Sequence, residues 1–339
     1  MAYDPNVLRR ATARLEEARR RRTDELERRR EEAYDRQPRL RQIDRSLQAT
    51  MAQLGAAALR QGGDVAAAIS AIREKNQDLQ RERGALLGAM GLPEDALDSK
   101  PACRHCGDSG WRGASMCTCL KTLYTQEQNQ ELSKLLDLGE QSFDNFRLDY
   151  YGQAPYPGKQ LSPRANMDLI YEVCLSYARK FDRFHFKNLL LSGAPGLGKT
   201  FLSACIARTV SERGYSVVYD TAANVFAQFE ARKFQRDGAD QREARDETRR
   251  YLGCDLLILD DLGSELTTQF TQASLYELVN NRLVSGRHTV ISSNLSLEEI
   301  GGRYSPQISS RIQGEYRLLH FYGEDIRQLK RNEMQFYEK

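Results

Sequence analysis

The residues best suited to chemistry form the stretch GAPGLGKT at 193–200, which follows an apolar run and precedes an amphipathic segment. Glycines at this spacing let the backbone curl so that N–H groups face a bound phosphate, and the following helix start adds positive potential. Lys199 brings a charge for the β- and γ-phosphates, and the Thr200 hydroxyl suits Mg²⁺. This pattern predicts an ATP-binding phosphate loop, with a chance Gly-rich turn as the alternative. The predicted nucleotide-binding residues are Gly193, Ala194, Pro195, Gly196, Leu197, Gly198, Lys199, Thr200 and Phe201.

Two acidic residues end a second apolar run, LLILDD at 256–261. A carboxylate at the end of a buried strand is placed to hold Mg²⁺, so Asp260 joins Thr200 as a predicted magnesium-binding residue. Asp261 would orient or deprotonate the attacking water. Aspartate is shorter than the glutamate that many ATPases carry there, so we expect slow turnover. Glu265 is a candidate helper, with an ordinary loop carboxylate as the equal alternative.

Three further side chains could sense or neutralise a γ-phosphate. Asn294 ends the run TVISSN and could position the lytic water; it could instead cap the next helix, for which Ser296 is an equal candidate. Arg311, in RYSPQISSRIQG, could neutralise charge in the site of a neighbouring subunit, with Arg303 as second choice and a plain surface arginine as the alternative. Arg327 could contact phosphate within its own subunit.

Four cysteines lie close together, as a Cx₂C pair and a CxC pair separated by a Gly-rich loop. Two close pairs suit tetrahedral thiolate coordination of zinc, and four filled positions predict a structural site. A redox dithiol would need only one pair, and an iron–sulfur cluster stays open as a rival. The predicted zinc ligands are Cys103, Cys106, Cys117 and Cys119.

The elements that position these residues change character along the chain. From about residue 166, apolar runs alternate with helical patterns, which predicts a five-stranded parallel sheet with helices on both faces, an α/β fold. Residues 1–100 read as an all-helical arm, with apolar spacing on both sides of QGGD at 61–64 that predicts a helical hairpin. The predicted divisions are the arm, a zinc-binding module with a short helix at 101–140, a linker at 141–165 and an ATPase domain at 166–339.

Composition limits the classes of function. The 339 residues are 40% hydrophobic and 29% charged, with no apolar run long enough for a membrane span, so we expect no membrane partner. The arginine-rich start has no apolar signal region, and seven cysteines suit a reducing compartment, so we expect a cytoplasmic protein. The arginine blocks near the start are interleaved with acids, which favours a solvated or protein-binding helix over nucleic acid.

One segment could contact DNA. NVFAQFEARKFQRDG at 224–238 interleaves phenylalanines with basic residues, and aromatic stacking with positive charge is how single strands are held without sequence preference. Phe226 and Phe229 are equally explained as the apolar face of a helix.

Taken in order, SFDNF, GAPGLGKT, LLILDDLGSE, TVISSN and RYSPQISSRI make the chain resemble replicative-helicase loaders of the DnaC/DnaI kind, within the AAA+ ATPases. The resemblance covers about half of the chain. It implies a P-loop AAA+ core, a hexameric replicative helicase gripped by the N-terminal region, assembly into homo-oligomers, and single-stranded DNA as a partner. It also implies that Asn294 is sensor 1, that Arg311 is the arginine finger and that Arg327 is a sensor-2-like arginine.

Two other functions stay open beside an ATP-dependent helicase loader. One is an IstB-like transposition helper ATPase, although such helpers usually have different N-terminal arms. The other is a non-hydrolysing adaptor that ATP merely holds in shape, an alternative that Asp261 keeps open.

Overall fold

The computed structural model describes four stretches of the chain: residues 3–58, 65–136, 141–234 and 239–337. The chain forms two compact units. The larger unit comprises Met1–Thr12 and Leu120–Lys339, and the smaller unit comprises Ala13–Cys119. This division differs from the predicted boundaries, because it groups the cysteine-rich segment with the arm and the helix that follows it with the larger unit.

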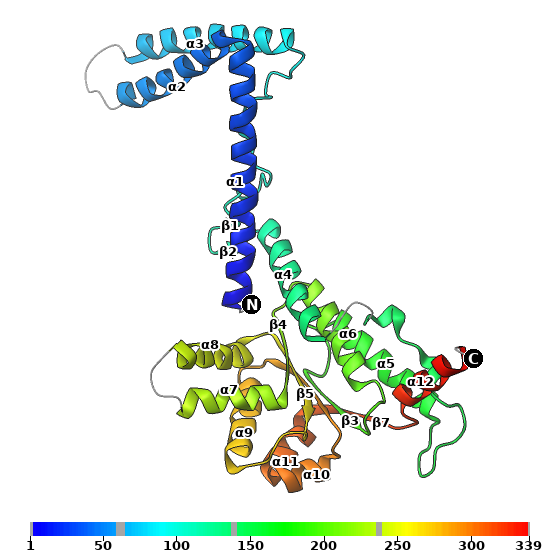
Figure 1. Ribbon diagram of the computed structural model, residues 1–339. Coiled ribbons are helices and arrows are strands. Elements are labelled where there is room, and N and C mark those ends of the chain that lie inside the picture. Colours follow the sequence, from blue (N-terminus) through cyan, green and yellow to red (C-terminus); the bar gives the residue numbers. More distant parts are fainter. Residues whose placement is uncertain (1–2, 59–64, 137–140, 235–238, 338–339) are drawn as a thin grey trace. The chain divides into compact units, whose positions relative to one another are not determined.

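A five-stranded parallel sheet forms the centre of the larger unit (Figure 1). Its strands are β3 (Asn188–Gly193), β4 (Val217–Thr221), β5 (Leu256–Leu262), β6 (His288–Ser293) and β7 (Tyr316–Phe321). They lie in the order β4-β5-β6-β3-β7, so β6 separates the strands that lead into the phosphate loop and the acidic pair. The predicted α/β fold with a five-stranded parallel sheet is confirmed.

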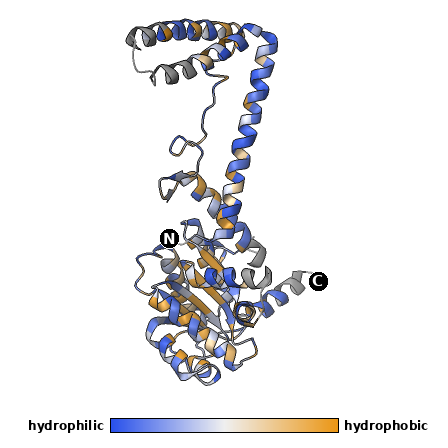
Figure 2. Cartoon of the chain, turned by 90° about the vertical axis from the view of Figure 1, so that its left-hand side faces the viewer, coloured by the Kyte–Doolittle hydropathy of each residue, from blue (hydrophilic) through white to orange (hydrophobic). Residues whose placement is uncertain are grey.

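Helices cover both faces of this sheet because successive strand residues point to opposite sides. Leu189 and Leu191 of β3 pack with α5 and α6, whereas Leu190 packs with α7 and α9. Figure 2 shows the hydrophobic strands enclosed by helices with polar outer faces. The helices of this unit include α4 (Thr118–Leu136), η1 (Phe143–Asn145), η2 (Leu148–Tyr150), α5 (Pro163–Arg179), α6 (Lys199–Glu212), α7 (Ala222–Phe234), α8 (Ala239–Gly253), α9 (Gln269–Val284), α10 (Leu297–Arg303), α11 (Pro306–Glu315) and α12 (Ile326–Tyr337).

Each outer strand of the sheet receives a side-chain amide. At β4, Gln128 of α4 accepts the N–H of Val217 at 3.0 Å and donates to the Tyr215 carbonyl at 2.8 Å. At β7, the Asn166 amide of α5 donates to the His320 carbonyl at 2.9 Å. These contacts satisfy backbone groups that face away from the neighbouring strand.

The segment predicted as a linker packs against the core of the larger unit. Phe143 of η1 and Tyr151, which follows η2, are both buried there. The Tyr171 hydroxyl of α5 donates to the Phe143 carbonyl at 3.1 Å. These contacts hold the aromatic residues of 143–151 beside the phosphate loop.

The smaller unit is built on helices. Its elements are most of α1 (Pro5–Arg36), then α2 (Pro38–Ala58), α3 (Val65–Ala89), β1 (Trp111–Arg112) and β2 (Ser115–Met116). Leu40 and Leu87 centre a small core between α2 and α3, and the Thr50 hydroxyl bonds to the Asn76 amide oxygen at 2.8 Å. The predicted helical arm is present, while the predicted turn at 61–64 lies outside the described residues.

No helix in the described stretches combines the length and the apolar character that a membrane crossing requires.

Candidate functional site

The phosphate loop joins the end of β3 to the start of α6, as the sequence predicts. Its glycines are required by close contacts as well as by backbone angles. Gly193 has φ +146°, and a Cβ there would lie 2.2 Å from the Phe321 carbonyl oxygen. Gly196 has φ +79°, and a Cβ there would lie 1.9 Å from a carboxylate oxygen of Asp325. Only glycine fits such positions without strain.

A cavity of about 550 Å³ opens over this loop. Its lining brings together Pro195–Phe201 with Asp260, Asp261, Asn294 and Arg327, all of which were predicted site residues. Gly193 and Ala194 take part through their carbonyl groups, which accept hydrogen bonds from the Lys199 amine at 2.6 Å and 2.8 Å.

Lys199 is the central cation of the cavity. Besides the two loop carbonyls, its amine donates to the Asn294 amide oxygen at 2.7 Å. Burial lowers the pKa of Lys199 to about 8, against the opposing effect of Asp261 and Asp260. A bound polyphosphate would restore a full charge here, because nearby anions favour the protonated amine.

Asp260 is held at the carboxyl end of β5. Its Oδ2 atom accepts hydrogen bonds from the Tyr219 hydroxyl at 2.6 Å and from the Thr200 hydroxyl at 3.3 Å. Its Oδ1 atom accepts from the Ser292 hydroxyl of β6. The Asp260 carboxylate and the Thr200 hydroxyl are hard oxygen donors on one cavity wall, so they fit the ligand preference of Mg²⁺.

Asp261 has an unusual backbone that the sequence did not reveal. Its φ is +56°, and the pairing of β5 with β6 shifts register between Leu259 and Leu262. Such irregularities occur beside active sites, where they redirect a side chain. Here the Asp261 carboxylate accepts from the Asn294 amide at 3.0 Å, and the Asp261 N–H donates to the Ser292 hydroxyl at 3.0 Å.

The residue that caps the helix after β6 is Ser296 and not Asn294. Ser296 is the N-cap of α10, where its hydroxyl accepts the Glu299 N–H at 3.2 Å and Glu299 bonds back to the Ser296 N–H. The Asn294 side chain is left to bridge Lys199 and Asp261 in the cavity.

Glu265, Arg303 and Arg311 do not line the cavity. The Glu265 carboxylate accepts from the Gly263 N–H at 3.0 Å and from the Tyr304 hydroxyl, so it braces the loop after β5. The Arg303 guanidinium donates to the Glu265 carbonyl at 2.7 Å, which makes it part of the same brace. Arg311 lies over the Tyr276 ring, 5.4 Å from its centre. Its predicted role in a neighbouring subunit stays a prediction.

An aromatic wall of the cavity was missed as part of the site. Phe146, Tyr150 and Tyr151 line the cavity, together with the cations Arg147 and Lys330. The Phe146 ring lies 5.6 Å from the ring of Phe201, and the Tyr151 hydroxyl donates to the Leu197 carbonyl at 3.0 Å. The motif SFDNF and the tyrosines after it were the available signal. Flat rings beside a phosphate loop suit a nucleotide base.

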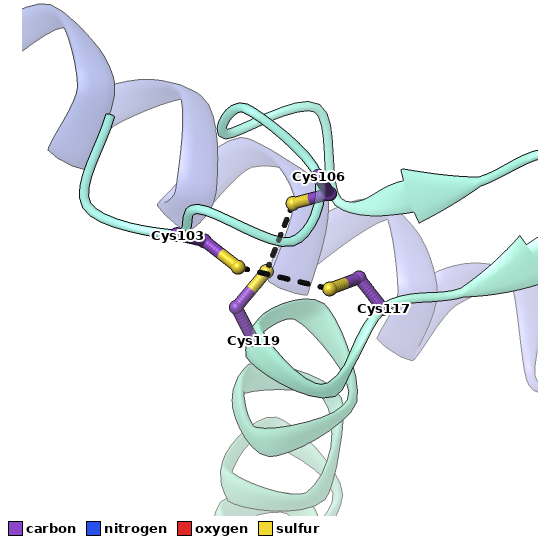
Figure 3. A group of neighbouring side chains, drawn as sticks. All are labelled: Cys103, Cys106, Cys117 and Cys119. Carbon is purple, nitrogen blue, oxygen red and sulfur yellow. Dashed lines mark hydrogen bonds between the residues drawn. The ribbon is translucent and has the colours of Figure 1, made fainter. Parts of the chain in front are cut away.

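The four predicted zinc ligands come together in the smaller unit, as Figure 3 shows. Their sulfur atoms all lie within 4.8 Å of one another, with 3.7 Å between Cys103 and Cys117 and 3.5 Å between Cys106 and Cys119. A tetrahedral zinc site with Zn–S bonds of about 2.3 Å needs sulfur separations of about 3.8 Å. The cluster is therefore compatible with zinc.

Asp108 organises the first cysteine turn, a role that the sequence did not reveal. Its buried carboxylate accepts the N–H groups of Ala102 at 3.0 Å and Cys103 at 2.8 Å, and pairs with Arg22 of α1 at 2.9 Å. The Gly110 N–H donates to the Cys106 sulfur at 3.3 Å. Outer contacts of this kind fix the direction of metal ligands.

The segment that could contact DNA, 224–238, contains both buried and exposed phenylalanines. Phe226 and Phe229 are buried in the core, which supports the packing alternative for them. Phe234 is 62% exposed, and its ring lies 5.5 Å from that of Phe270, with Lys233 over both rings. The rest of the segment, 235–238, lies outside the described residues.

Comparison with known families matches residues 177–312 to the model of the IstB-like ATP binding proteins. The match covers less than half of the chain. The matched region holds the phosphate loop, Asp260, Asp261 and Asn294, which line the cavity, and also Arg311, which does not. Arg327 and the aromatic wall lie outside it.

Curated proteins similar to this chain agree with the resemblance that the motifs indicate. The chain is 24% identical over 172 residues to the replicative helicase loader DnaC of Escherichia coli (strain K12), which is 51% of this chain and 62% of that protein. It is 30% identical over 150 residues to a protein described as an insertion sequence ATP-binding protein, y4pL of Sinorhizobium fredii (strain NBRC 101917 / NGR234), which is 42% of this chain and 58% of that protein. The similarity to DnaC-type helicase loaders is confirmed.

Among solved structures, the DnaC helicase loader aligns with a TM-score of 0.42 and 20% identity. The alignment covers 53% of this chain and 98% of that one. In the sequence comparison, the chain spans 62% of the length of the curated DnaC protein, which is less than two thirds.

Proposed function

We propose that the protein is an ATP-dependent loader that places a replicative DNA helicase on single-stranded DNA. The main support for ATP dependence is a series of hydrogen bonds in one cavity, which runs from Lys199 through Asn294 to Asp261. The helicase partner rests on the similarity to DnaC.

The cavity supports ATP hydrolysis through its own side chains. Lys199 would bind the triphosphate, and Thr200 with Asp260 would hold Mg²⁺, which neutralises phosphate charge when bound. Asp261 would accept a proton from the attacking water, and the Asn294 amide, already bonded to it, would keep that water in line. The aspartate at position 261 supports slow turnover.

A neighbouring subunit would complete the site. In the described part of the chain, Arg311 is held only by its contacts with Tyr276, which is itself 39% exposed. An arginine bound this loosely could reach the phosphates of an adjacent copy, where its permanent charge stabilises the transition state. Hydrolysis would then require a homo-oligomer.

The partner surfaces are assigned to different parts of the chain. The helical arm with its zinc-compatible cluster would grip the hexameric helicase. The Phe234–Phe270 pair with Lys233 would contact single-stranded DNA, because exposed rings beside a cation suit base stacking.

A transposition helper is the second candidate, since the family model and one relative are of the IstB type. The two functions separate in a reconstitution with the full chain, a purified replicative helicase, ATP and circular single-stranded DNA. We expect helicase on the DNA only when the loader and ATP are both present, and loss of loading with Lys199→Ala. Failure to load, together with capture of a transposase from the native cell, would overturn the helicase assignment.

The third candidate, a non-hydrolysing adaptor, predicts ATP binding without turnover. Phosphate release by the wild-type chain, with Asp261→Asn as the matched control, decides this point. Binding without any release in the presence of helicase and DNA would favour the adaptor.

A further inference from the structure

The Asp260 carboxylate is clasped by hydroxyl groups from both neighbouring strands. Tyr219 lies on β4 and Ser292 on β6, so they reach Asp260 from opposite sides of β5. All three residues are buried, with Asp260 7%, Tyr219 5% and Ser292 2% exposed. Water therefore has little access to replace either hydroxyl.

The two hydroxyls hold different parts of the acidic pair. The Tyr219 hydroxyl donates to Asp260, through the same carboxylate oxygen that faces Thr200. Ser292 donates to the other oxygen of Asp260 and also accepts the N–H of Asp261. One serine thus fixes the Asp260 side chain together with the backbone of Asp261.

We propose that Tyr219 and Ser292 are positioning residues that set the affinity of the site for the divalent cation of ATP. The proposal rests on the proposed ATP-binding function. Without its clasp, the Asp260 carboxylate could rotate about its side-chain bonds away from the direction of Thr200, and metal ligands lose affinity when such outer contacts are removed. Ser292 has a second task, because it also holds the residue assigned to the attacking water.

This difference predicts two distinct phenotypes in the full-length protein. Tyr219→Phe should raise the Mg²⁺ concentration at half-maximal turnover about 10- to 100-fold, with kcat at saturating Mg²⁺ within about threefold of wild type. Ser292→Ala should show the same metal shift and also lower kcat at saturating Mg²⁺ by about tenfold. Ser292→Thr keeps a hydroxyl and should recover most of the metal affinity.

The chain offers matched controls for both changes. Tyr251 also donates its hydroxyl to a carboxylate, that of Asp220 at 2.7 Å, but away from the cavity lining. Ser293 is a buried serine next to Ser292, and its hydroxyl donates to the Leu262 carbonyl at 2.6 Å. Tyr251→Phe and Ser293→Ala should leave the Mg²⁺ dependence unchanged.

A binding measurement separates the proposal from catalysis. Electron paramagnetic resonance of Mn²⁺ with ATP should show weaker Mn²⁺ binding in Tyr219→Phe and Ser292→Ala, while binding of a fluorescent ATP analogue without metal stays at the wild-type level. Wild-type Mn²⁺ affinity in both variants overturns the positioning role and leaves the ATPase proposal intact. A wild-type chain that binds no ATP overturns both.

Discussion

Lys199 is the ionisable group that should matter most directly for the proposed nucleotide binding. Burial lowers the pKa of this amine to about 8, and only the protonated amine attracts a triphosphate. Above that pKa, binding must take up a proton, so affinity falls as the pH rises. Below it, the amine is already charged and the pH has little effect.

The resulting prediction is a loss of ATP affinity of about tenfold between pH 7 and pH 9. Calorimetric or fluorescence titration of ATP across this range measures it. Lys199→Arg should remove the slope, because arginine stays charged throughout. An equal slope in Lys199→Arg would assign the titration to another group.

Side chains within short motifs could be identified from the sequence because their spacing is local. Lys199, Thr200 and the four cysteines are of this kind. Tyr219 and Ser292 were missed because their contacts with Asp260 depend on which strands become neighbours. The positive φ of Asp261 could not be predicted for a related reason, because it accompanies a register shift in the pairing of β5 with β6.

At the scale of elements, one polar face of α4 bonds both to the edge strand β4 and to the first residues of the chain. Tyr124, Gln128 and Glu131 lie on this face at helical spacing. The Asp4 N–H donates to the Tyr124 hydroxyl at 2.8 Å, and Arg10 pairs with Glu131 at 2.5 Å. The sequence predicted a short helix here, but a helix made mostly of polar residues gives no pattern that marks its buried side.

Gln128→Ala tests the importance of this face for stability. The change leaves the Val217 N–H and the Tyr215 carbonyl without their partner, and each unpaired buried group costs about 1–3 kcal/mol. We expect the free energy of unfolding in urea to fall by about 2–4 kcal/mol. Gln126 is exposed on the same helix, and Gln126→Ala should change little. Equal stability of the two variants would show that the contact is not needed.

At the scale of the whole molecule, the cysteine cluster should link folding of the smaller unit to metal. We expect about one zinc per chain, because four thiolates fill one tetrahedral site. Cys106→Ser should lose the zinc and lower the thermal stability, whereas Cys205→Ala, at a buried cysteine of the sheet core, should keep it. Elemental analysis of the purified proteins measures the metal. Iron, or a metal-free protein that is fully folded, would contradict the zinc assignment.

Subunit cooperation is the second prediction at this scale. Arg311→Ala and Asp261→Asn should each abolish turnover, because one removes the donated cation and the other the base. In an equal mixture, random assembly restores about a quarter of the interfaces, since each site needs an intact residue from each of two copies. Phosphate release at several mixing ratios measures this rescue. Its absence at every ratio would place both residues in the same subunit or remove Arg311 from the reaction.

The amides of Gln128 and Asn166 bear on how copies of this chain can associate. The edge strands of a sheet have unpaired backbone groups that can pair with a strand of another polypeptide, which is a route to fibres. Gln128 at the edge strand β4 and Asn166 at the edge strand β7 already bond to backbone groups that such pairing would use. Pairing of monomers edge to edge into a continuous sheet is therefore disfavoured, so the proposed self-association would use surfaces made of helices and loops, where a small ligand could govern it.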